Sequence, residues 1–412
     1  MRRLLVDLTD VGLYARKASQ VTGIQRVQLE VARGLLGCTN VQAFALLDRK
    51  ALDVSRLVPA GNSNSRESFD SFVQLGRRRR FFSRIQFHAS SWLQPLPWRD
   101  AVSALDIADL ALTADDVLYI GGAFWDGHDS LPLYEFAASI GVSLVAFVHD
   151  VIPLTHPTLT GPYAFPLFKR LLKLPLNVVT PSDFSRRDIL KACKQFDLPL
   201  PQSMQVIPLA HQYPGVARNA PDPLPSERLR NRLGTRPFIL TVGTVEVRKN
   251  QELLLRTWER LASGPTAVPP LVVAGAAGWM ASPVVKSLRR ASAGTPYIFI
   301  EAPTDSELEW LYARCLFTVF ASKVEGWGLP VGESLWFGKP CVTTRTASLP
   351  EVGGGLCDYV DDLTPEGMAK GVRDLLKDER YVAKAATISQ APLRTWDGVS
   401  TEIAKYVETF RR

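Results

Sequence analysis

The chain has 412 residues, of which 46% are hydrophobic and 22% are charged, and its formal net charge is +7. This composition excludes an intrinsically disordered chain, and the length exceeds what one hydrophobic core usually organises, so we expect two domains. The modest charge does not require nucleic acid as a partner, although it suits an anionic ligand or a membrane surface.

The N-terminal half alternates short apolar runs with helix-like segments, which is typical of βαβ units. Parallel strands joined in this way form a doubly wound sheet, whose ligands lie at the carboxyl ends of the strands. We therefore predict an α/β, Rossmann-like domain over residues 1–208. Its strands are predicted at 3–8, 41–47, 116–122, 143–150, 177–182 and 204–209, and two of its helices at 24–36 and 162–174.

A basic cluster lies inside this half, at Arg77–Arg84. Four consecutive arginines precede Phe81, Phe82 and Arg84. Basic and aromatic side chains together suit an anionic lipid interface. The alternative is a solvated helix face or loop.

The composition changes after Pro208. Residues 213–237 contain five prolines and two glycines, so we assign 209–235 to a linker. Strands predicted at 238–243, 270–275, 297–302, 316–322, 339–344 and 359–362 then indicate a second doubly wound domain over 236–390. Apolar residues in 391–412 have helical spacing, which predicts a C-terminal helix. A return of this helix to the N-terminal domain is one of its possible positions.

Two glutamates flank the loop after the fourth strand of the second domain. Glu325 and Glu333 are separated by seven residues, and we expect Glu333 in the first turn of the next helix. Loop glycines let backbone N–H groups approach a ligand closely, and a helix N-terminus favours a diphosphate. Carboxylates repel phosphate but accept hydrogen bonds from hydroxyls, so sugar and ribose hydroxyls are the expected partners of the glutamates. The alternative is a pair of exposed surface acids. The residues between them assigned to ligand binding are Gly326, Trp327, Gly328 and Leu329.

Arg248 and Lys249 follow the first strand of the second domain, directly before a helix predicted at 251–261. Adjacent cations at a helix entrance can clamp phosphate oxygens, Arg as a fork and Lys as a point charge. A positioned cation also stabilises the charge that develops on a departing phosphate. The alternative is a solvated basic pair.

In the first domain, His149 and Asp150 end a strand at the edge where a doubly wound sheet presents ligand-facing residues. A lone histidine at a strand end is more often structural. Ser182 and Asp183 follow the next strand, and Asp183 suits the start of a helix. Gly23 precedes the helix at 24–36, where an ordinary loop glycine is the alternative to a functional one.

Taken together, the segments at 242–250, 271–279, 319–334 and 349–354 resemble the retaining GT-B glycosyltransferases of family 4 over most of the C-terminal half. The resemblance implies two Rossmann-like domains facing across a cleft. It implies that Glu333 binds the donor ribose, that Glu325 and the loop backbone bind the donor sugar, and that Lys249 with Arg248 binds the diphosphate. Many members carry Arg directly after the glycine that corresponds to Gly243, which leaves Arg248 to supply that charge here.

In the N-terminal half, the resemblance places Gly23 near the donor phosphates and His149 beside the transferred sugar. It places Ser182 at the donor or acceptor side, and Asp150 toward the acceptor. The opening LLVDLTD followed by TGIQRV resembles polysaccharide-building mannosyl- or rhamnosyltransferases.

The resemblance thus implies a retaining hexosyltransferase that moves a sugar, mannose or rhamnose, from an NDP-sugar to a saccharide or lipid-linked acceptor in surface polysaccharide synthesis, such as lipopolysaccharide. The alternatives are a nucleotide-sugar epimerase of the GT-B fold, a sugar phosphorylase, and a noncatalytic nucleotide-sugar binding protein. A dehydrogenase is disfavoured because the GAAG at 275–278 lacks the dinucleotide-binding spacing.

The sequence has no D-x-D pair, so we expect transfer without a metal or other cofactor. Its five cysteines form no CxxC pair, which favours a reducing compartment. The N-terminus is predicted to be a strand rather than a signal peptide, and no apolar stretch reaches the roughly 18 residues of a membrane span. We therefore expect a cytoplasmic protein, with peripheral contact at the inner membrane face through Arg77–Arg84 as an option.

Overall fold

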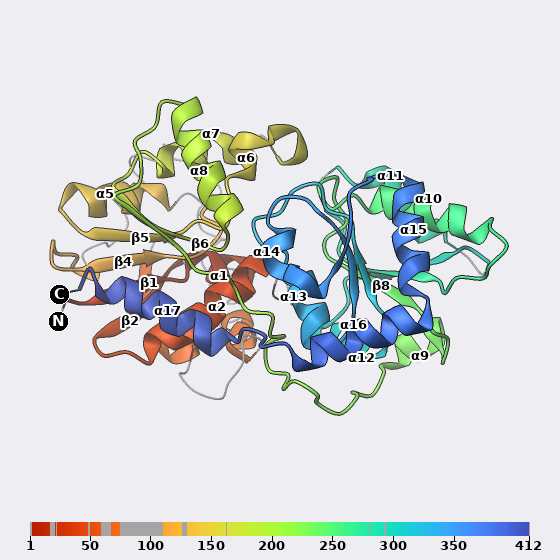
Figure 1. Cartoon of the computed structure of the whole chain (residues 1–412). Helices are drawn as coiled ribbons and strands as arrows, with labels where there is room; N and C mark the ends of the chain where they lie inside the picture. Colours follow the sequence, from red (N-terminus) through yellow and green to blue (C-terminus); the bar gives the residue numbers. More distant parts are fainter. Residues whose placement is uncertain are drawn as a thin grey trace, which may run out of the picture.

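The computed structural model describes residues 2–16, 21, 23–47, 50–58, 67–74, 110–125, 130–161, 163–278, 280–291 and 294–411. The described chain forms two α/β domains side by side, each with helices packed around a central sheet (Figure 1). The predicted Arg77–Arg84 cluster lies outside the described residues.

The N-terminal sheet has seven strands in the order β3-β2-β1-β4-β5-β6-β7. Its strand pairs are parallel except for β2 with β3, which form an antiparallel edge. Helices cover both faces, so β1, β4 and β6 are buried along their whole length and consist of nearly continuous apolar runs. The bounds are β1 (Leu4–Asp7), β2 (Val41–Leu47), β3 (Lys50–Asp53), β4 (Val117–Ile120), β5 (Ser143–Phe147), β6 (Leu176–Thr180) and β7 (Ser203–Val206).

The C-terminal sheet has six strands, all parallel, in the order β10-β9-β8-β11-β12-β13. In both sheets the chain starts near the middle, winds to one edge, and then returns to wind to the other. This arrangement confirms the predicted pair of doubly wound domains. The bounds are β8 (Ile239–Val242), β9 (Leu271–Gly275), β10 (Tyr297–Glu301), β11 (Thr318–Phe320), β12 (Cys341–Thr344) and β13 (Asp358–Val360).

The helices mostly follow the strands in alternation, as expected for crossover connections. In the N-terminal domain they are α1 (Thr9–Tyr14), α2 (Gly23–Leu36), α5 (Leu131–Ser139), α6 (Ile152–Thr155), α7 (Ala164–Leu171) and α8 (Asp183–Gln195). Those that follow β7 are α9 (Glu227–Leu233), α10 (Gln251–Ala262), α11 (Ser282–Arg290), α12 (Asp305–Arg314), α13 (Leu329–Trp336), α14 (Leu349–Gly353), α15 (Pro365–Leu375), α16 (Asp378–Gln390) and α17 (Trp396–Glu408).

The predicted linker, 209–235, contains helix α9, which the sequence analysis did not expect. Ser226 caps its first turn by accepting from the Leu229 N–H, and Gly234, with a φ of 59°, ends it. Leu229 and Leu233 are buried in the core of the C-terminal domain. The proline-rich part of the linker therefore ends before α9, and α9 itself packs with the second domain.

Helix α17 leaves the C-terminal domain and packs along α2 of the N-terminal domain (Figure 1). Gly34 of α2 allows the close approach, since a Cβ there would lie 2.2 Å from the Ser400 Cβ. The buried Arg411 guanidinium, just beyond α17, donates to the carbonyls of Arg2, Thr39 and Asn40. The end of the chain thus joins the two domains a second time.

Candidate active site

Glu325, Arg248 and Lys249 meet where two paired strands of the C-terminal sheet end. Arg248 and Lys249 follow β8, and Glu325 follows β11, which pairs with β8. Arg248 Nη1 donates to Glu325 Oε2 over 2.6 Å, and Lys249 Nζ donates to Oε1 over 2.5 Å. Burial alone would raise the pKa of the Glu325 carboxyl, but the charges of Arg248 and Lys249 outweigh it and lower the pKa from 4.5 to about 2. Glu325 therefore stays ionised and holds both cations at one point.

This cluster has further fixed contacts. Ser322 Oγ donates to Glu325 Oε1 over 2.7 Å, and Arg248 Nη2 donates to Glu246 Oε1 over 2.7 Å. Two cations thus face two carboxylates. A diphosphate that bound here would compete with the carboxylates for the guanidinium and the ammonium group.

The loop after Glu325 has its carbonyl groups fixed by serines. Ser348 Oγ donates to the Glu325 carbonyl over 2.9 Å and to the Trp327 carbonyl over 2.7 Å. Ser182 Oγ, from the other domain, donates to the Gly326 carbonyl over 2.8 Å. Within the part of the chain that the structure describes, the backbone N–H groups of Gly326, Trp327 and Gly328 have no acceptor, and neither has the buried Trp327 indole N–H. The loop therefore offers N–H donors to a ligand, while its carbonyl oxygens already accept hydrogen bonds from serines.

The surroundings of residues 326 and 328 leave no room for a side chain, so glycine is required at both positions. A Cβ on Gly326 would lie 2.4 Å from the His149 carbonyl oxygen and 2.9 Å from the Asp150 Cβ. Gly328 has a φ of 117°, and a Cβ there would lie 2.7 Å from a Leu349 methyl group. The 326–328 loop thus packs directly on the end of β5, and the bond from Ser182 to the Gly326 carbonyl bridges the two domains there. Leu329 follows as the first residue of α13.

His149 lies at the end of β5 with its ring buried. Its Nε2 is 3.0 Å from the Gly121 carbonyl, which can only accept, so Nε2 carries the proton. Burial lowers the pKa of His149 from 6.5 to about 4, although the bond to Gly121 acts in the opposite direction. The imidazole is therefore neutral at pH 7, and Nδ1 is left as an acceptor.

Asp150 lies next to His149 at the same domain boundary. Its Oδ1 accepts from the Ile152 N–H over 3.0 Å. Burial raises the pKa of the Asp150 carboxyl, and the nearby charge of Arg248 acts in the opposite direction. Arg248 of the C-terminal cluster thus acts electrostatically on Asp150, the residue predicted to lie toward the acceptor.

Ser182 is the N-cap of α8, because its side chain accepts from the Ser185 N–H over 3.0 Å. Ser185 Oγ adds donated bonds to the carbonyls of His149 and Gly326. The Glu351 carboxylate, from α14 of the other domain, accepts from the N–H groups of Asp183 and Phe184 over 2.6 and 2.8 Å. The N-terminus of α8 is therefore a junction between the domains.

Glu333 lies in the second turn of α13, one turn later than the sequence analysis expected. The helix begins at Leu329, which follows a left-handed glycine, so Glu333 is its fifth residue. Arg26 Nη1 donates to Glu333 Oε1 over 2.9 Å, and the Tyr312 hydroxyl donates to Oε2 over 2.8 Å. The carboxylate is buried, and neither partner was identified from the sequence.

The two remaining glycines of the predicted donor site lie beside these groups. Gly243 directly follows β8 and has a φ of 139°, and its carbonyl oxygen would lie 2.0 Å from a Cβ at Gly275. Gly23 begins α2, where a Cβ would lie 3.5 Å from a Leu329 methyl group. Gly23 therefore lies close to the start of α13, across the domain boundary.

The structure thus brings Arg248, Lys249 and Glu325 together beside the His149–Asp150 strand end. Glu333 instead bonds to Arg26 and Tyr312, which were not predicted. Sequence reasoning missed Arg26, Ser185, Tyr312, Ser348 and Glu351. The motifs TGIQRV and LPEVGG contain Arg26 and Glu351, but nothing in their spacing indicates a partner in the other domain.

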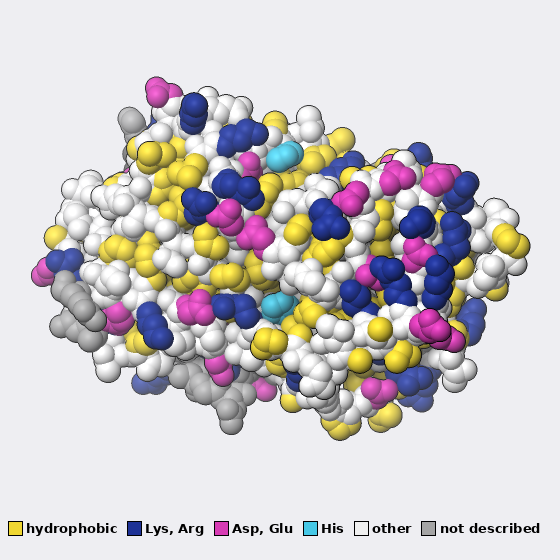
Figure 2. Space-filling model, viewed as in Figure 1, with side chains coloured by type: hydrophobic (Ala, Val, Ile, Leu, Met, Phe, Trp, Pro, Cys, Tyr) yellow, Lys and Arg dark blue, Asp and Glu magenta, His cyan; other side chains and the backbone are white. Residues whose placement is uncertain are grey.

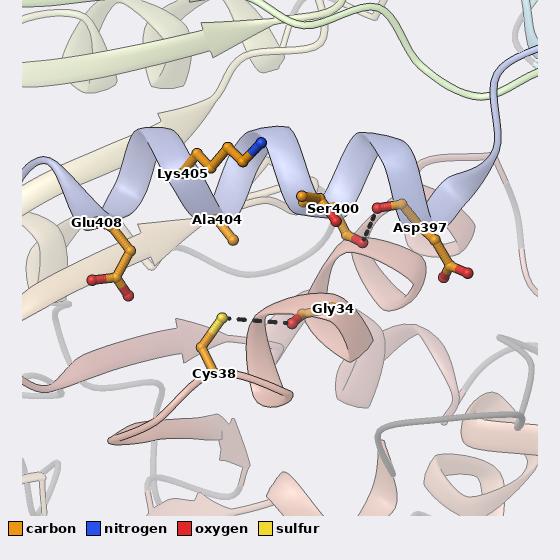
Figure 3. A pocket seen from close by; sticks show the side chains of 8 residues that line it. Gly34, Cys38, Asp397, Ser400, Ala404, Lys405 and Glu408 are labelled. Carbon is orange, nitrogen blue, oxygen red and sulfur yellow. Dashed lines mark hydrogen bonds between the residues drawn. The ribbon is translucent and has the colours of Figure 1, made fainter.

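Two other features of the described surface differ from this arrangement. A hollow of about 650 Å³ lies between α2 and α17, away from Glu325 and Glu333, and includes Cys38 and Lys405 in its lining (Figure 3). Lys and Arg side chains gather on the C-terminal domain among acidic ones (Figure 2). In this domain, Arg256 pairs with Glu252, and Arg380 pairs with Asp358. In the described ranges, no group of three His, Cys, Asp or Glu side chains could hold a metal ion, and no helix is long and apolar enough to cross a membrane.

Comparison with known proteins identifies proteins that are similar to this chain. Residues 226–391 match the family described as glycosyl transferases group 1. O-antigen chain mannosyltransferase B from Escherichia coli is 28% identical over 227 residues, 55% of this chain and 58% of that protein. A serotype-specific mannosyltransferase WbdA from Escherichia coli is 26% identical over 415 residues, 94% of this chain and 46% of that protein. The chain spans about half the length of the curated relatives it matches.

Solved structures share the fold. Anabaena Alr3699/HepE, determined in complex with UDP and glucose, is 17% identical with a TM-score of 0.62, and the match covers 100% of this chain and 97% of that one. WaaG, a glycosyltransferase involved in lipopolysaccharide biosynthesis, is 14% identical with a TM-score of 0.57, covering 98% of this chain and 99% of that one. At these identities the likeness concerns the fold.

Proposed function

We propose that this chain is a GT-B glycosyltransferase of group 1 that transfers a hexose from a nucleotide diphosphate donor to a saccharide acceptor, with retention at the anomeric carbon. The observation that carries the proposal is the cluster of Arg248, Lys249 and Glu325 beside a loop with unused N–H donors. Cations and backbone donors at one point suit a diphosphate that carries a sugar.

In this reaction, the bond between the anomeric carbon and the diphosphate oxygen breaks, and the acceptor hydroxyl oxygen bonds to that carbon on the same face. The departing diphosphate accepts the hydroxyl proton. Lys249 and Arg248 stabilise the negative charge that grows on the diphosphate, aided by the N–H groups of the 326–328 loop. No enzyme nucleophile is required.

The remaining residues orient the donor. Glu333 accepts hydrogen bonds from the ribose hydroxyls, and Glu325 accepts from the sugar. His149, neutral and protonated on Nε2, offers its Nδ1 to a sugar hydroxyl. Ser182 acts by holding the loop through the Gly326 carbonyl, and Asp150 lies on the side of the acceptor.

Mannose is the donor sugar that we favour for this chain, because the similar Escherichia coli proteins are described as mannosyltransferases. Rhamnose is the second choice. The acceptor in this proposal is a saccharide or a lipid-linked saccharide of a surface polysaccharide, such as the O-antigen of lipopolysaccharide.

The first test is a thermal-shift screen with GDP, UDP, dTDP and ADP, because a ligand that binds the native state raises its melting temperature. The matching NDP-hexose is then incubated with oligosaccharide acceptors, and products are separated by mass. A new acceptor-linked glycoside with retained anomeric configuration supports the proposal. Donor epimerisation, or binding without any transfer, would contradict it.

The proposal includes transfer without a metal, in which Arg248 and Lys249 take the role of a divalent cation at the diphosphate. Activity is therefore expected to survive EDTA. Activity that EDTA abolished and magnesium or manganese restored would contradict this part.

Peripheral membrane contact at the cytoplasmic face is a separate part of the proposal, and it rests on the Arg77–Arg84 sequence alone. Each basic residue near an anionic surface contributes about 1 kcal/mol, screened by salt. Anionic vesicles should sediment the parent at low salt and release it at high salt. Equal sedimentation of a variant with serine at 77–80 would remove this assignment.

A further inference from the structure

Arg26 is an N-terminal-domain residue that is buried inside the C-terminal domain. It is the fourth residue of α2, at the end of the first turn, and its side chain is 9% exposed. Nη1 donates to Glu333 Oε1 and Nη2 donates to Asp305 Oδ1, each over 2.9 Å. The guanidinium carbon lies 5.1 Å from the centre of the Tyr213 ring, in the segment between the domains. One guanidinium thus joins α2 to α12, α13 and that segment.

Its main partner, Glu333, is held from two sides. Arg26 occupies one lone pair of Oε1, and the Tyr312 hydroxyl occupies one of Oε2. The Tyr312 ring is stacked on Phe337 at a centroid distance of 5.3 Å, which fixes the position of its hydroxyl. A carboxylate offers about four acceptor positions, so about two remain. Two free positions, one on each oxygen, match the two hydroxyls of a ribose.

The two partners of Glu333 differ in origin. Tyr312 belongs to the same domain as Glu333, so its bond is independent of how the domains are placed. Arg26 belongs to the other domain, so its bond exists only when the domains are together. Arg26 also places a positive charge 2.9 Å from this buried carboxylate.

We propose that Arg26 is a positioning residue for the nucleotide: it orients the Glu333 carboxylate toward the ribose diol and thereby makes nucleotide affinity depend on contact between the two domains. This inference rests on the proposed function, in which Glu333 binds the ribose. If contact between the domains raises nucleotide affinity by some factor, bound nucleotide must favour that contact by the same factor.

A second bridge between the domains supplies a control. Glu351 accepts from the N–H groups of Asp183 and Phe184 at the start of α8. It joins the domains as Arg26 does but has no bond to Glu333 in the described chain. Glu351→Gln therefore weakens domain contact alone, Tyr312→Phe disturbs Glu333 alone, and Arg26→Gln does both.

The test measures nucleotide affinity by calorimetry and domain separation by small-angle X-ray scattering. The probe is GDP, or the diphosphate among GDP, UDP, dTDP and ADP that binds the parent most tightly. Arg26→Gln is expected to weaken binding on the order of ten-fold, as for a lost bond to a charged group, and to increase the radius of gyration. Tyr312→Phe should weaken binding without changing the radius. Glu351→Gln should increase the radius less than Arg26→Gln does and change affinity less than about three-fold, because its bonds are exposed and the bond from Arg26 to Glu333 still joins the domains.

Arg26→Lys distinguishes positioning from general stability. It keeps the charge but loses the two-armed geometry, so binding should lie between the parent and Arg26→Gln. If Arg26→Gln does not fold, this variant carries the test. With turnover as a readout, both should raise KM for the donor more than they lower kcat.

Two results would overturn the inference, and they differ in what they mean for the proposed function. If Glu333→Gln loses affinity but Arg26→Gln and Arg26→Lys bind as tightly as the parent, or more tightly, the positioning role is wrong and the ribose assignment stands. If Glu333→Gln itself binds the nucleotide like the parent, both the inference and the ribose assignment fail.

Discussion

Lys249 Nζ lies 2.5 Å from Glu325 Oε1, and the two residues leave paired strands of the C-terminal sheet. The same ammonium group lies 5.2 Å from the centre of the Phe320 ring. Lys249 is therefore a largely buried cation whose position is set by a carboxylate and an aromatic ring. This placement is suited to an anion that gains charge during a reaction.

The first prediction concerns this lysine. Lys249→Ala is expected to lower turnover at saturating donor by at least about 100-fold, because a cation aimed at developing charge acts mainly in the transition state. Steady-state assays of transfer measure it. Arg256→Ala is the control, since Arg256 is exposed on α10 and pairs only with Glu252 among the described contacts. Equal turnover in Lys249→Ala and the parent would refute the role of Lys249.

The second prediction uses the buried neutral state of His149. Burial lowers its pKa from 6.5 to about 4, so between these pH values the unfolded chain binds a proton that the folded one does not. Stability contributed by the neutral imidazole is therefore present above pH 6.5 and is lost as pH falls toward 4. Urea unfolding should show a loss of about 3 kcal/mol over this range that His149→Gln lacks.

His149→Gln is a suitable reference because its amide can still donate to the Gly121 carbonyl but does not titrate. The comparison is between the two stability curves, so that other titrating groups, such as His211, cancel. Parallel curves for the parent and the variant between pH 6.5 and 4 would show that His149 is not held neutral.

The third prediction tests the contact between the 326–328 loop and β5. Gly326→Ala would put a Cβ 2.4 Å from the His149 carbonyl oxygen. Such overpacking costs about 1–3 kcal/mol, so the loop and β5 should move apart. Turnover should fall at least about ten-fold, with an increased radius of gyration. Gly355→Ala is the control, since a Cβ at Gly355 would meet nothing within 4 Å. Parental turnover in Gly326→Ala would contradict the contact.

The position of the cation cluster was within reach of the sequence. Strand runs such as 238–243 and 316–322 are apolar and bounded by clear breaks, and parallel strands end at the same edge of a sheet. Residues placed directly after two such strands must lie near each other if the strands are neighbours. Arg248 and Glu325 satisfy this condition, and the structure pairs them.

Other parts of the site could not be read from local patterns. Arg26 and Glu333 are 307 residues apart, and their bond depends on how two domains are placed. Periodicity describes which face of an element is buried, but it does not identify a partner in another domain. Arg26 lies among the buried residues of α2, where an arginine looks like an exception to the apolar face. The bond from Glu351 to the start of α8 could not be predicted either, because these two residues also lie in different domains.

The last prediction concerns the return of α17 to the N-terminal domain. A Cβ at Gly34 would lie 2.2 Å from the Ser400 Cβ and 2.3 Å from its Oγ, so Gly34→Ala must force α2 and α17 apart. In an isolated helix the same change would stabilise by about 1 kcal/mol, since alanine is the better helix former. The sign of the effect therefore reveals whether the helices are in contact.

We expect Gly34→Ala to lower the free energy of unfolding by about 1–3 kcal/mol in urea titrations. The matched variant is Gly34→Ala with Ser400→Gly, which removes the opposing Cβ and Oγ and should restore part of the loss. Because the two residues touch, their effects should not add. A Gly34→Ala variant more stable than the parent would show that α17 does not pack on α2 at this point, and that the end of the chain joins the domains elsewhere.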